Sequence, residues 1–172
     1  MSSKKNVVLV GFMGTGKTAV GKILAQQLNR PVVDVDAWIE RAEGRKISEI
    51  FSESGESFFR ALEKKAIHEI TAREAIVITT GGGAVIDAEN RARLRQTGWV
   101  IALLAKPATI AARVKDAKDR PLLKDGDPLK KIDSLLTARR AFYEDCDFSF
   151  ETDGLRPAEV AQKILETLKG KI

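Results

Sequence analysis

The chain has 172 residues, of which 44% are hydrophobic, 31% charged and 6% aromatic. This length and composition predict one folded domain, residues 1–172, and exclude a disordered chain. The single cysteine, Cys146, excludes an internal disulfide and a cysteine-based zinc site, as expected in a reducing compartment. No apolar run approaches the roughly 18 residues of a membrane span, and the N-terminus has no signal-peptide pattern, so we expect a cytoplasmic protein without a membrane partner.

The formal net charge of +5 raises the question of nucleic-acid binding. The 29 basic residues are mixed with 24 acidic ones, and the sequence has no helix-turn-helix, RNA-binding or zinc-finger signature. We therefore expect no nucleic-acid partner. A basic balance also suits small anionic substrates.

Five short apolar runs, at residues 7–10, 31–33, 76–78, 99–104 and, more weakly, 148–150, are predicted to be strands. Three of them are almost continuously apolar, which is typical of strands covered on both faces. Helical periodicity fills most of the intervals. The sequence therefore predicts a three-layer α/β/α fold with a five-stranded parallel sheet.

Amphipathic helices are predicted from residue 20 to 28, over 56–71, over 129–143, and near the C-terminus after Pro157. The segment 115–128 is rich in Asp, Lys, Gly and Pro. We interpret it as a mobile lid.

The first strand is followed by Gly11-Phe12-Met13-Gly14-Thr15-Gly16-Lys17-Thr18, which matches the phosphate-binding loop Gly-x-x-x-x-Gly-Lys-Thr. Such a loop directs backbone N–H groups and the N-terminus of the next helix at phosphate oxygens. Lys17 would bridge the β- and γ-phosphates, and the Thr18 hydroxyl would bind Mg²⁺. We therefore predict binding of a nucleoside triphosphate.

The same loop occurs in kinases and in GTP-driven switches. A switch needs Asp-x-x-Gly after a later strand and Asn/Thr-Lys-x-Asp to read guanine, and the sequence has neither. A kinase acting on a small molecule is the favoured interpretation.

Asp34 and Asp36 follow the second predicted strand, at the edge of the sheet where ligands bind in parallel α/β folds. Two carboxylates one residue apart on a strand point the same way, so one could serve the metal and the other an acceptor hydroxyl. The alternative is that Asp36 caps the next helix.

Arg139 falls near the centre of the apolar stripe of the helix predicted over 129–143, whereas Arg140 falls at its edge. A buried arginine is costly unless it is paired. Arg60 lies one turn from Glu63 and could form a simple ion pair with it. In the functional interpretation, Glu63 orients Arg60, and Arg60 and Arg139 supply two guanidinium groups for a carboxylate.

Three glycines, Gly81, Gly82 and Gly83, follow the third strand, where they would let the backbone approach a ligand closely. Arg113 and Arg120 flank the predicted lid and could also be ordinary surface charges. His68 falls on the polar face of its helix and is assigned no role.

Together these residues resemble the shikimate kinase family over essentially the whole chain. The motifs that carry the resemblance are the phosphate-binding loop, Asp34-x-Asp36, Ile47-Ser48-Glu49-Ile50-Phe51 with Gly55-Glu56, Phe59-Arg60 with Glu63, the triple glycine, Arg120-Pro121-Leu122-Leu123, and Arg139 four residues before Tyr143.

The resemblance implies a sheet of the nucleoside-monophosphate-kinase type and transfer of the ATP γ-phosphate to the 3-hydroxyl of shikimate, in the pathway to chorismate. It implies ATP and shikimate as the small-molecule substrates, Mg²⁺ as the cofactor, and we expect a monomer. The ATP-binding residues that it implies are Gly14, Thr15, Gly16, Lys17, Thr18, Arg113, Arg120 and Pro157.

By the same resemblance, Asp34 binds Mg²⁺ through water together with Thr18, and Asp36 binds the shikimate hydroxyls. The remaining substrate residues are Arg60, Gly82, Gly83 and Arg139. Lys17, Asp36 and Arg120 are the candidate catalytic residues, with Arg120 closing over the phosphates.

The sequence departs from the family pattern at Ala19, Val35 and Cys146, and none of these changes removes a proposed ligand. The alternative function is a related kinase acting on another hydroxylated acid such as gluconate, because paired arginines fit any carboxylate.

Overall fold

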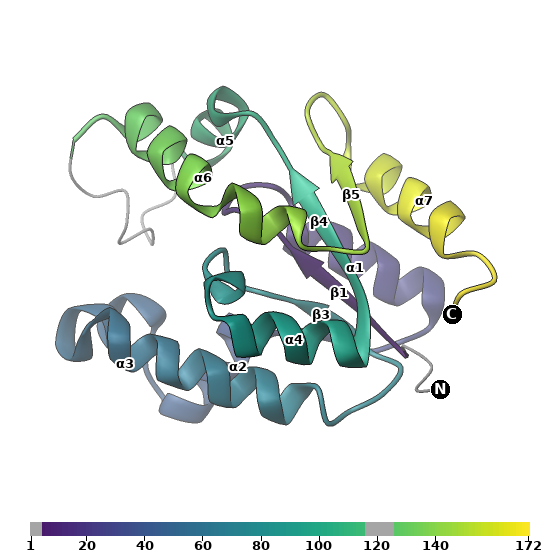
Figure 1. Ribbon diagram of the computed structural model, residues 1–172, viewed down its shortest axis with the longest axis horizontal. Helices are drawn as coiled ribbons and strands as arrows, with labels where there is room; N and C mark the ends of the chain where they lie inside the picture. Colours follow the sequence, from purple (N-terminus) through teal and green to yellow (C-terminus); the bar gives the residue numbers. More distant parts are fainter. Residues whose placement is uncertain (1–4, 116–125) are drawn as a thin grey trace.

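The computed structural model describes residues 5–115 and 126–172. The described residues form one sheet of five strands, ordered β2-β3-β1-β4-β5, in which every pairing is parallel (Figure 1). The strands are β1 (Asn6–Val10), β2 (Val32–Asp34), β3 (Val77–Thr79), β4 (Gly98–Leu104) and β5 (Phe148–Glu151). The predicted parallel sheet is confirmed, with strand ends that differ from the prediction by one residue in most cases.

The helices in the described ranges are α1 (Lys17–Leu28), α2 (Val35–Glu43), α3 (Ile47–Ile70), the short 3₁₀ helix η1 (Ala84–Ile86), α4 (Ala88–Thr97), α5 (Pro107–Val114), α6 (Pro128–Glu144) and α7 (Pro157–Leu168). Helix α3 is longer than predicted. Gly55 interrupts it with non-helical backbone (φ 82°), so the predicted helix 56–71 corresponds to its second part.

The core consists of two apolar layers, one on each face of the sheet. The alternation of β1 sends Val7 and Leu9 to one face and Val8 and Val10 to the other, and all four are almost fully buried. Helices α1 and α7 cover the first face, and α2 to α6 lie over the second (Figure 1). Each fully buried side chain of this size stabilises the fold by about 1.5 to 3 kcal/mol. The predicted three-layer α/β/α arrangement is thereby confirmed.

Parallel pairing brings the carboxyl ends of the strands to one edge of the sheet. The segments that follow β1, β2 and β3 start there, because β1 and β2 both pair with β3 in register. The predicted phosphate-binding loop, the two aspartates and the triple glycine therefore meet at this edge.

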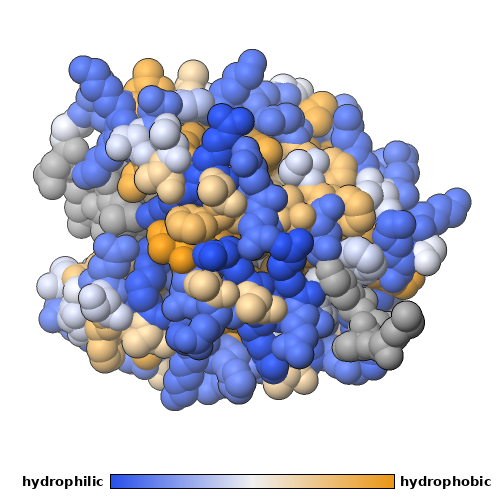
Figure 2. Space-filling model, in the orientation of Figure 1, coloured by the Kyte–Doolittle hydropathy of each residue, from blue (hydrophilic) through white to orange (hydrophobic). Residues whose placement is uncertain are grey.

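The surface seen in Figure 2 is mostly hydrophilic, with hydrophobic residues in small groups. Large hydrophobic side chains that are exposed lie on separate elements of the described chain: Val32, Phe58, Ile86, Leu129 and Ile172. Within residues 5–115 and 126–172, no helix is long and apolar enough to cross a membrane.

Candidate active site

The phosphate-binding loop leaves β1 at Gly11 and ends in the first turn of α1. Gly11 has a φ of 143°, and a Cβ there would collide with the carbonyl oxygen of Leu103. Only glycine fits at this point of the loop. Gly16 is the N-cap of α1 and has no side chain to cap the helix, so the first N–H groups of α1 face the loop rather than a protein side chain.

Lys17 is held over the loop by its own backbone. Its Nζ donates hydrogen bonds to the carbonyl oxygens of Gly11 (2.7 Å) and Phe12 (2.8 Å), and only 9% of the residue is exposed. Thr15 Oγ1 also donates to the Phe12 carbonyl oxygen (2.8 Å). These bonds hold the ammonium group on the concave side of the loop, where it can contact phosphate oxygens.

A cleft of about 290 Å³ opens in front of the loop. It is lined by Lys17 and Thr18 from the loop, by Asp34 and Asp36, and by Gly82. The structure thus brings together the predicted nucleotide, metal and acceptor residues, which come from three different segments of the chain.

The geometry predicted for the two aspartates is wrong in one respect. Strand β2 ends at Asp34, and Val35 already begins α2, so Asp36 lies in the first turn of a helix. The N-cap is Asp34, not Asp36: its carboxylate accepts hydrogen bonds from Ala37 N (3.0 Å) and Thr79 Oγ1 (2.6 Å). Both aspartates nevertheless line the same cleft, Asp34 from the end of β2 and Asp36 from the first turn of α2.

The predicted pair between Arg60 and Glu63 is confirmed. Arg60 Nη1 donates to Glu63 Oε1 (2.8 Å), and Nη2 donates to Glu56 Oε1 (3.2 Å). Glu63 is 1% exposed, whereas the Arg60 side chain is 24% exposed. The guanidinium group is therefore held from behind by a buried carboxylate while part of it remains accessible.

The triple glycine explains how these charged groups come so close to the backbone. A Cβ on Gly83 would collide with the guanidinium group of Arg60. A Cβ on Gly81 would lie 2.9 Å from Asp36 Oδ1 and 3.2 Å from Glu63 Oε2. The glycines thus allow the backbone to lie directly against Arg60, Asp36 and Glu63, which is close approach and not a floppy turn.

Arg139 is buried, as its place in the apolar stripe predicts. It is 6% exposed, and its guanidinium carbon lies 5.7 Å from the centre of the Phe12 ring, which belongs to the phosphate-binding loop. A cation over an aromatic face is stabilised by the ring quadrupole. The neighbouring Arg140 side chain is 80% exposed and pairs with Glu144 (2.8 Å). The two adjacent arginines therefore have different environments.

Burial sets the ionisation of two groups in this pocket. Burial raises the pKa of Glu63 to about 7, against the opposing effect of Arg60, and Asp36 raises it further. Burial also raises the pKa of Tyr143 to about 12, although the charge of Arg139 lowers it. The charges of Arg60 and Arg139 both lower the pKa of Glu63 and of Tyr143, so the two guanidinium groups lie near the same pair of buried side chains.

Arg113 is not an isolated surface charge. Its guanidinium group donates to the carbonyl oxygen of Gly14 (3.1 Å), to Thr152 Oγ1 (3.0 Å) and to the Thr152 carbonyl oxygen (2.8 Å). It therefore ties the phosphate-binding loop to the segment after β5, and that segment leads to the exposed Pro157 at the start of α7.

Thr18 and Asp34 offer the oxygen donors that Mg²⁺ prefers. They line one cleft, and Asp34 accepts two hydrogen bonds, which leaves further lone pairs of its carboxylate for water or metal. Among the described residues there is no group of three or more His, Cys, Asp or Glu side chains that could hold a metal by themselves. Mg²⁺ is typically bound by one or two protein oxygens together with substrate phosphates, so these residues fit it. Arg120 and most of the predicted lid lie outside the described residues.

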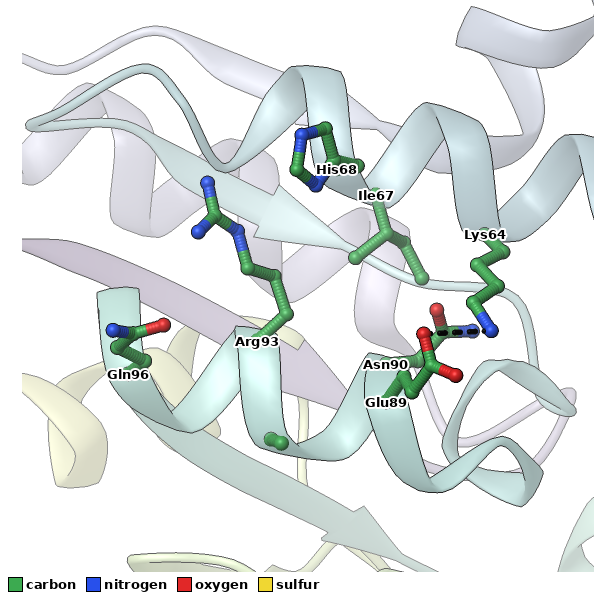
Figure 3. Close-up of a pocket in the computed structure, with 8 residues that line it drawn as sticks. Lys64, Ile67, His68, Glu89, Asn90, Arg93 and Gln96 are labelled. Atoms are coloured by element: carbon green, nitrogen blue, oxygen red, sulfur yellow. Dashed lines mark ion pairs between the residues drawn. The ribbon is translucent and has the colours of Figure 1, made fainter.

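A second pocket, of about 280 Å³, lies between α3 and α4 (Figure 3). Lys64 and His68 of α3 face Glu89 and Arg93 of α4, and Lys64 pairs with Glu89 (2.8 Å). Its lining includes His68 and none of the predicted site residues.

Two contacts of the site were not predicted from the sequence. Thr79 holds Asp34, and Phe12 lies under Arg139. Both depend on which strand and helix become neighbours, so no local pattern reveals them. The sequence assigns Tyr143 no role of its own. Its position one turn after Arg139, on the same helix face, is the one local pattern that points to it.

Comparison with known proteins agrees with this arrangement. A family model described as shikimate kinase matches residues 13–169. A shikimate kinase of Thermodesulfovibrio yellowstonii is 49% identical over 162 residues, which are 94% of each chain. The solved structure of a shikimate kinase from Acinetobacter baumannii in complex with shikimate superposes with a TM-score of 0.94, at 40% identity, covering 98% of this chain and 94% of that one. The chain belongs to the shikimate kinase family.

The alternative function receives weaker support than this family assignment. A gluconokinase from Sinorhizobium meliloti covers 98% of this chain with a TM-score of 0.59, but at 16% identity the likeness shows the fold alone. Shikimate kinases and the gluconokinase thus share the architecture.

Proposed function

We propose that this member of the shikimate kinase family transfers the γ-phosphoryl group of ATP to the 3-hydroxyl of shikimate, giving shikimate 3-phosphate and ADP in the pathway to chorismate and the aromatic amino acids. The observation that carries the proposal is the grouping of Arg60, Arg139 and Asp36 around the buried Glu63, with Asp36 also lining the cleft in front of the phosphate-binding loop. Two guanidinium groups and one aspartate match an acceptor that has a carboxylate and several hydroxyls.

On the nucleotide side, the backbone N–H groups of Gly14, Thr15 and Gly16 and the ammonium group of Lys17 bind the phosphates. Lys17 starts from hydrogen bonds to two loop carbonyls, so it is already oriented before ATP arrives. Arg113 supports the loop from the side of Pro157, where the adenine would lie. Arg120 is proposed to act on the phosphates as well, on the resemblance alone.

On the acceptor side, Arg60 and Arg139 bind the carboxylate, and Asp36 accepts the hydrogen bond of the reacting hydroxyl. The hydroxyl oxygen forms a bond to the γ-phosphorus while the bond from that phosphorus to the β–γ bridging oxygen breaks, and the hydroxyl proton passes to the Asp36 carboxylate. Electrostatic stabilisation and positioning supply most of the rate enhancement in such transfers. When bound between Thr18, Asp34 and the phosphates, Mg²⁺ would neutralise the charge that develops on the leaving oxygen.

A coupled assay of ADP release tests this function. Purified protein with ATP and Mg²⁺ is offered shikimate, gluconate and nucleoside monophosphates at equal concentrations. We expect shikimate to be phosphorylated with a kcat/KM at least about a hundredfold above that of the others. The ring of shikimate holds its carboxylate and hydroxyls in one fixed arrangement, whereas gluconate is an open chain that must be ordered on binding and nucleoside monophosphates have no carboxylate. Comparable rates with gluconate, or no ADP release with shikimate, would refute the assignment.

A further inference from the structure

Tyr143 is the only tyrosine of the chain, and it lies at the back of the acceptor pocket. It is 2% exposed and stands one helical turn after Arg139 on α6. Its hydroxyl donates a hydrogen bond to the carbonyl oxygen of Gly82 at 2.5 Å. This bond joins α6 to the triple glycine across 61 residues of sequence.

The hydrogen bond acts on one peptide plane. The carbonyl of Gly82 and the N–H of Gly83 belong to the same planar, trans peptide, in which they point in opposite directions. Holding the carbonyl toward Tyr143 therefore fixes the Gly83 N–H away from α6. Glycine has no side chain to restrict its dihedral angles, so without this bond the plane could rotate.

Gly82 and Gly83 are packed closely against two other segments of the site. A Cβ on Gly82 would lie 3.2 Å from the backbone nitrogen of Met13 in the phosphate-binding loop, and a Cβ on Gly83 would collide with Arg60. The segment is thus enclosed by the phosphate-binding loop, α3 and α6. The N–H groups of Gly82 and Gly83 donate no hydrogen bond to any residue in the described part of the chain. Both N–H groups, which lie near Arg60, are therefore available to donate a hydrogen bond to a ligand.

We propose that Tyr143 is a positioning residue for the acceptor: its hydroxyl holds the Gly82–Gly83 peptide so that the backbone N–H of Gly83 donates a hydrogen bond to an oxygen of shikimate. The inference rests on the proposed function and adds to it a residue that does not touch the substrate. Tyr143 acts through Gly82, in the way that a buried polar partner orients a group of the site. Its hydroxyl remains a donor across the working pH range, since the pKa of Tyr143 is raised to about 12.

The substitution Tyr143→Phe keeps the ring and removes the hydroxyl. We expect the KM for shikimate to rise roughly tenfold, the size of one lost hydrogen bond, while the KM for ATP stays within about twofold. A merely structural role would lower the melting temperature without separating the two KM values. Thr71→Val is the matched control. Thr71 is also buried, and its hydroxyl donates to a backbone carbonyl, that of Ile67 (2.6 Å), at the C-terminal end of α3 and away from the predicted site residues.

A second measurement reports on the backbone N–H groups themselves, first in the unaltered protein and then in Tyr143→Phe. With ¹⁵N-glycine labelling, amide hydrogen exchange at Gly82 and Gly83 is followed by NMR with and without shikimate. We expect shikimate to slow exchange at Gly83 in the unaltered protein and to slow it several-fold less in Tyr143→Phe, whereas Gly82, whose N–H belongs to the preceding peptide, should respond to shikimate equally in both proteins.

Three outcomes separate the possibilities. If the unaltered protein does not phosphorylate shikimate, the proposed function fails, and the inference with it. If it does, but Tyr143→Phe leaves the shikimate KM within twofold of the original, the positioning role is wrong. If Tyr143→Phe does not fold, the exchange measurement on the unaltered protein decides: unchanged exchange at Gly83 when shikimate binds overturns the proposal.

Discussion

The phosphate-binding loop and the acceptor pocket lie side by side but are built in different ways. The loop is eight consecutive residues, Gly11 to Thr18, and it presents mostly backbone groups whose geometry is set by glycines. The acceptor pocket takes Asp36 from α2, Arg60 and Glu63 from α3, the triple glycine after β3, and Arg139 from α6. Recognition in the loop is thus local and rests on backbone, whereas recognition in the pocket rests on side-chain charges from distant segments.

This difference determines how each region responds to change. Truncating a side chain to alanine leaves the backbone donors in place, so Lys17 is the main side chain on which phosphate binding by the loop depends. The pocket contains several charged groups, two of them almost fully buried, and each one influences its neighbours. The effects of two substitutions in the pocket on shikimate binding should therefore be non-additive, whereas the effects of substitutions outside it should add.

The largest effect is expected for Lys17→Ala. Removing one preorganised charge from the transferring phosphoryl group costs about a thousandfold in kcat, while the layered core is untouched. Steady-state kinetics with a thermal unfolding control measures this. Lys22→Ala, an exposed lysine later on α1, is the matched control and should keep normal turnover. Near-normal turnover of Lys17→Ala would mean that the nucleotide site is assigned wrongly.

The next largest effect separates two adjacent arginines. Arg139→Ala should weaken shikimate binding by about a hundredfold, roughly 2.7 kcal/mol, because it removes the partner of a desolvated carboxylate. ATP affinity should change little. Arg140→Ala, whose side chain is 80% exposed, should bind shikimate normally. Titration calorimetry measures all three affinities, and equal losses in both variants would contradict the division between a buried and a solvated arginine.

A smaller effect tests the coupling within the pocket. Gly83→Ala adds one methyl group that must displace the guanidinium of Arg60, so we expect the shikimate KM to rise about tenfold. In a double-mutant cycle with Arg60→Ala, the second substitution should add little, because the group that is displaced is already gone. Additive losses would show that Gly83 acts independently of Arg60.

The smallest effect concerns pH. The pKa of Glu63 is raised by burial to about 7 from an ordinary value of 4.5, so between these values the folded protein holds a proton that the unfolded chain releases. The free energy of unfolding should therefore fall as pH rises through this window. Glu63→Gln should remove that part of the slope, and Glu56→Gln, which alters the exposed partner of Arg60, should not. Denaturant unfolding at pH 5 and pH 7.5 checks this; parallel behaviour of Glu63→Gln and the unaltered protein would contradict it.

The two regions also differ in how far the sequence predicts them. The loop, the five strands and the burial of Arg139 follow from local order and periodicity, and the structure confirms them. The strand geometry predicted for Asp34 and Asp36 is wrong, because Asp34 ends β2 and caps α2, and its carboxylate also accepts a hydrogen bond from Thr79 on the neighbouring strand. The contacts of Arg113 with Thr152, and of Tyr143 with Gly82, join residues far apart in the chain. They become visible only once the topology is known.

The most direct test of the acceptor pocket compares shikimate with its methyl ester, which keeps the ring and the hydroxyls but lacks the negative charge. Titration calorimetry with the unaltered protein should show the ester binding about a hundredfold more weakly than shikimate. With Arg139→Ala, the difference in affinity between shikimate and its ester should shrink, since one of the guanidinium groups that bind the carboxylate is absent. Equal affinity of the unaltered protein for shikimate and its ester would contradict the account, because Arg60 and Arg139 would then not be reading a carboxylate.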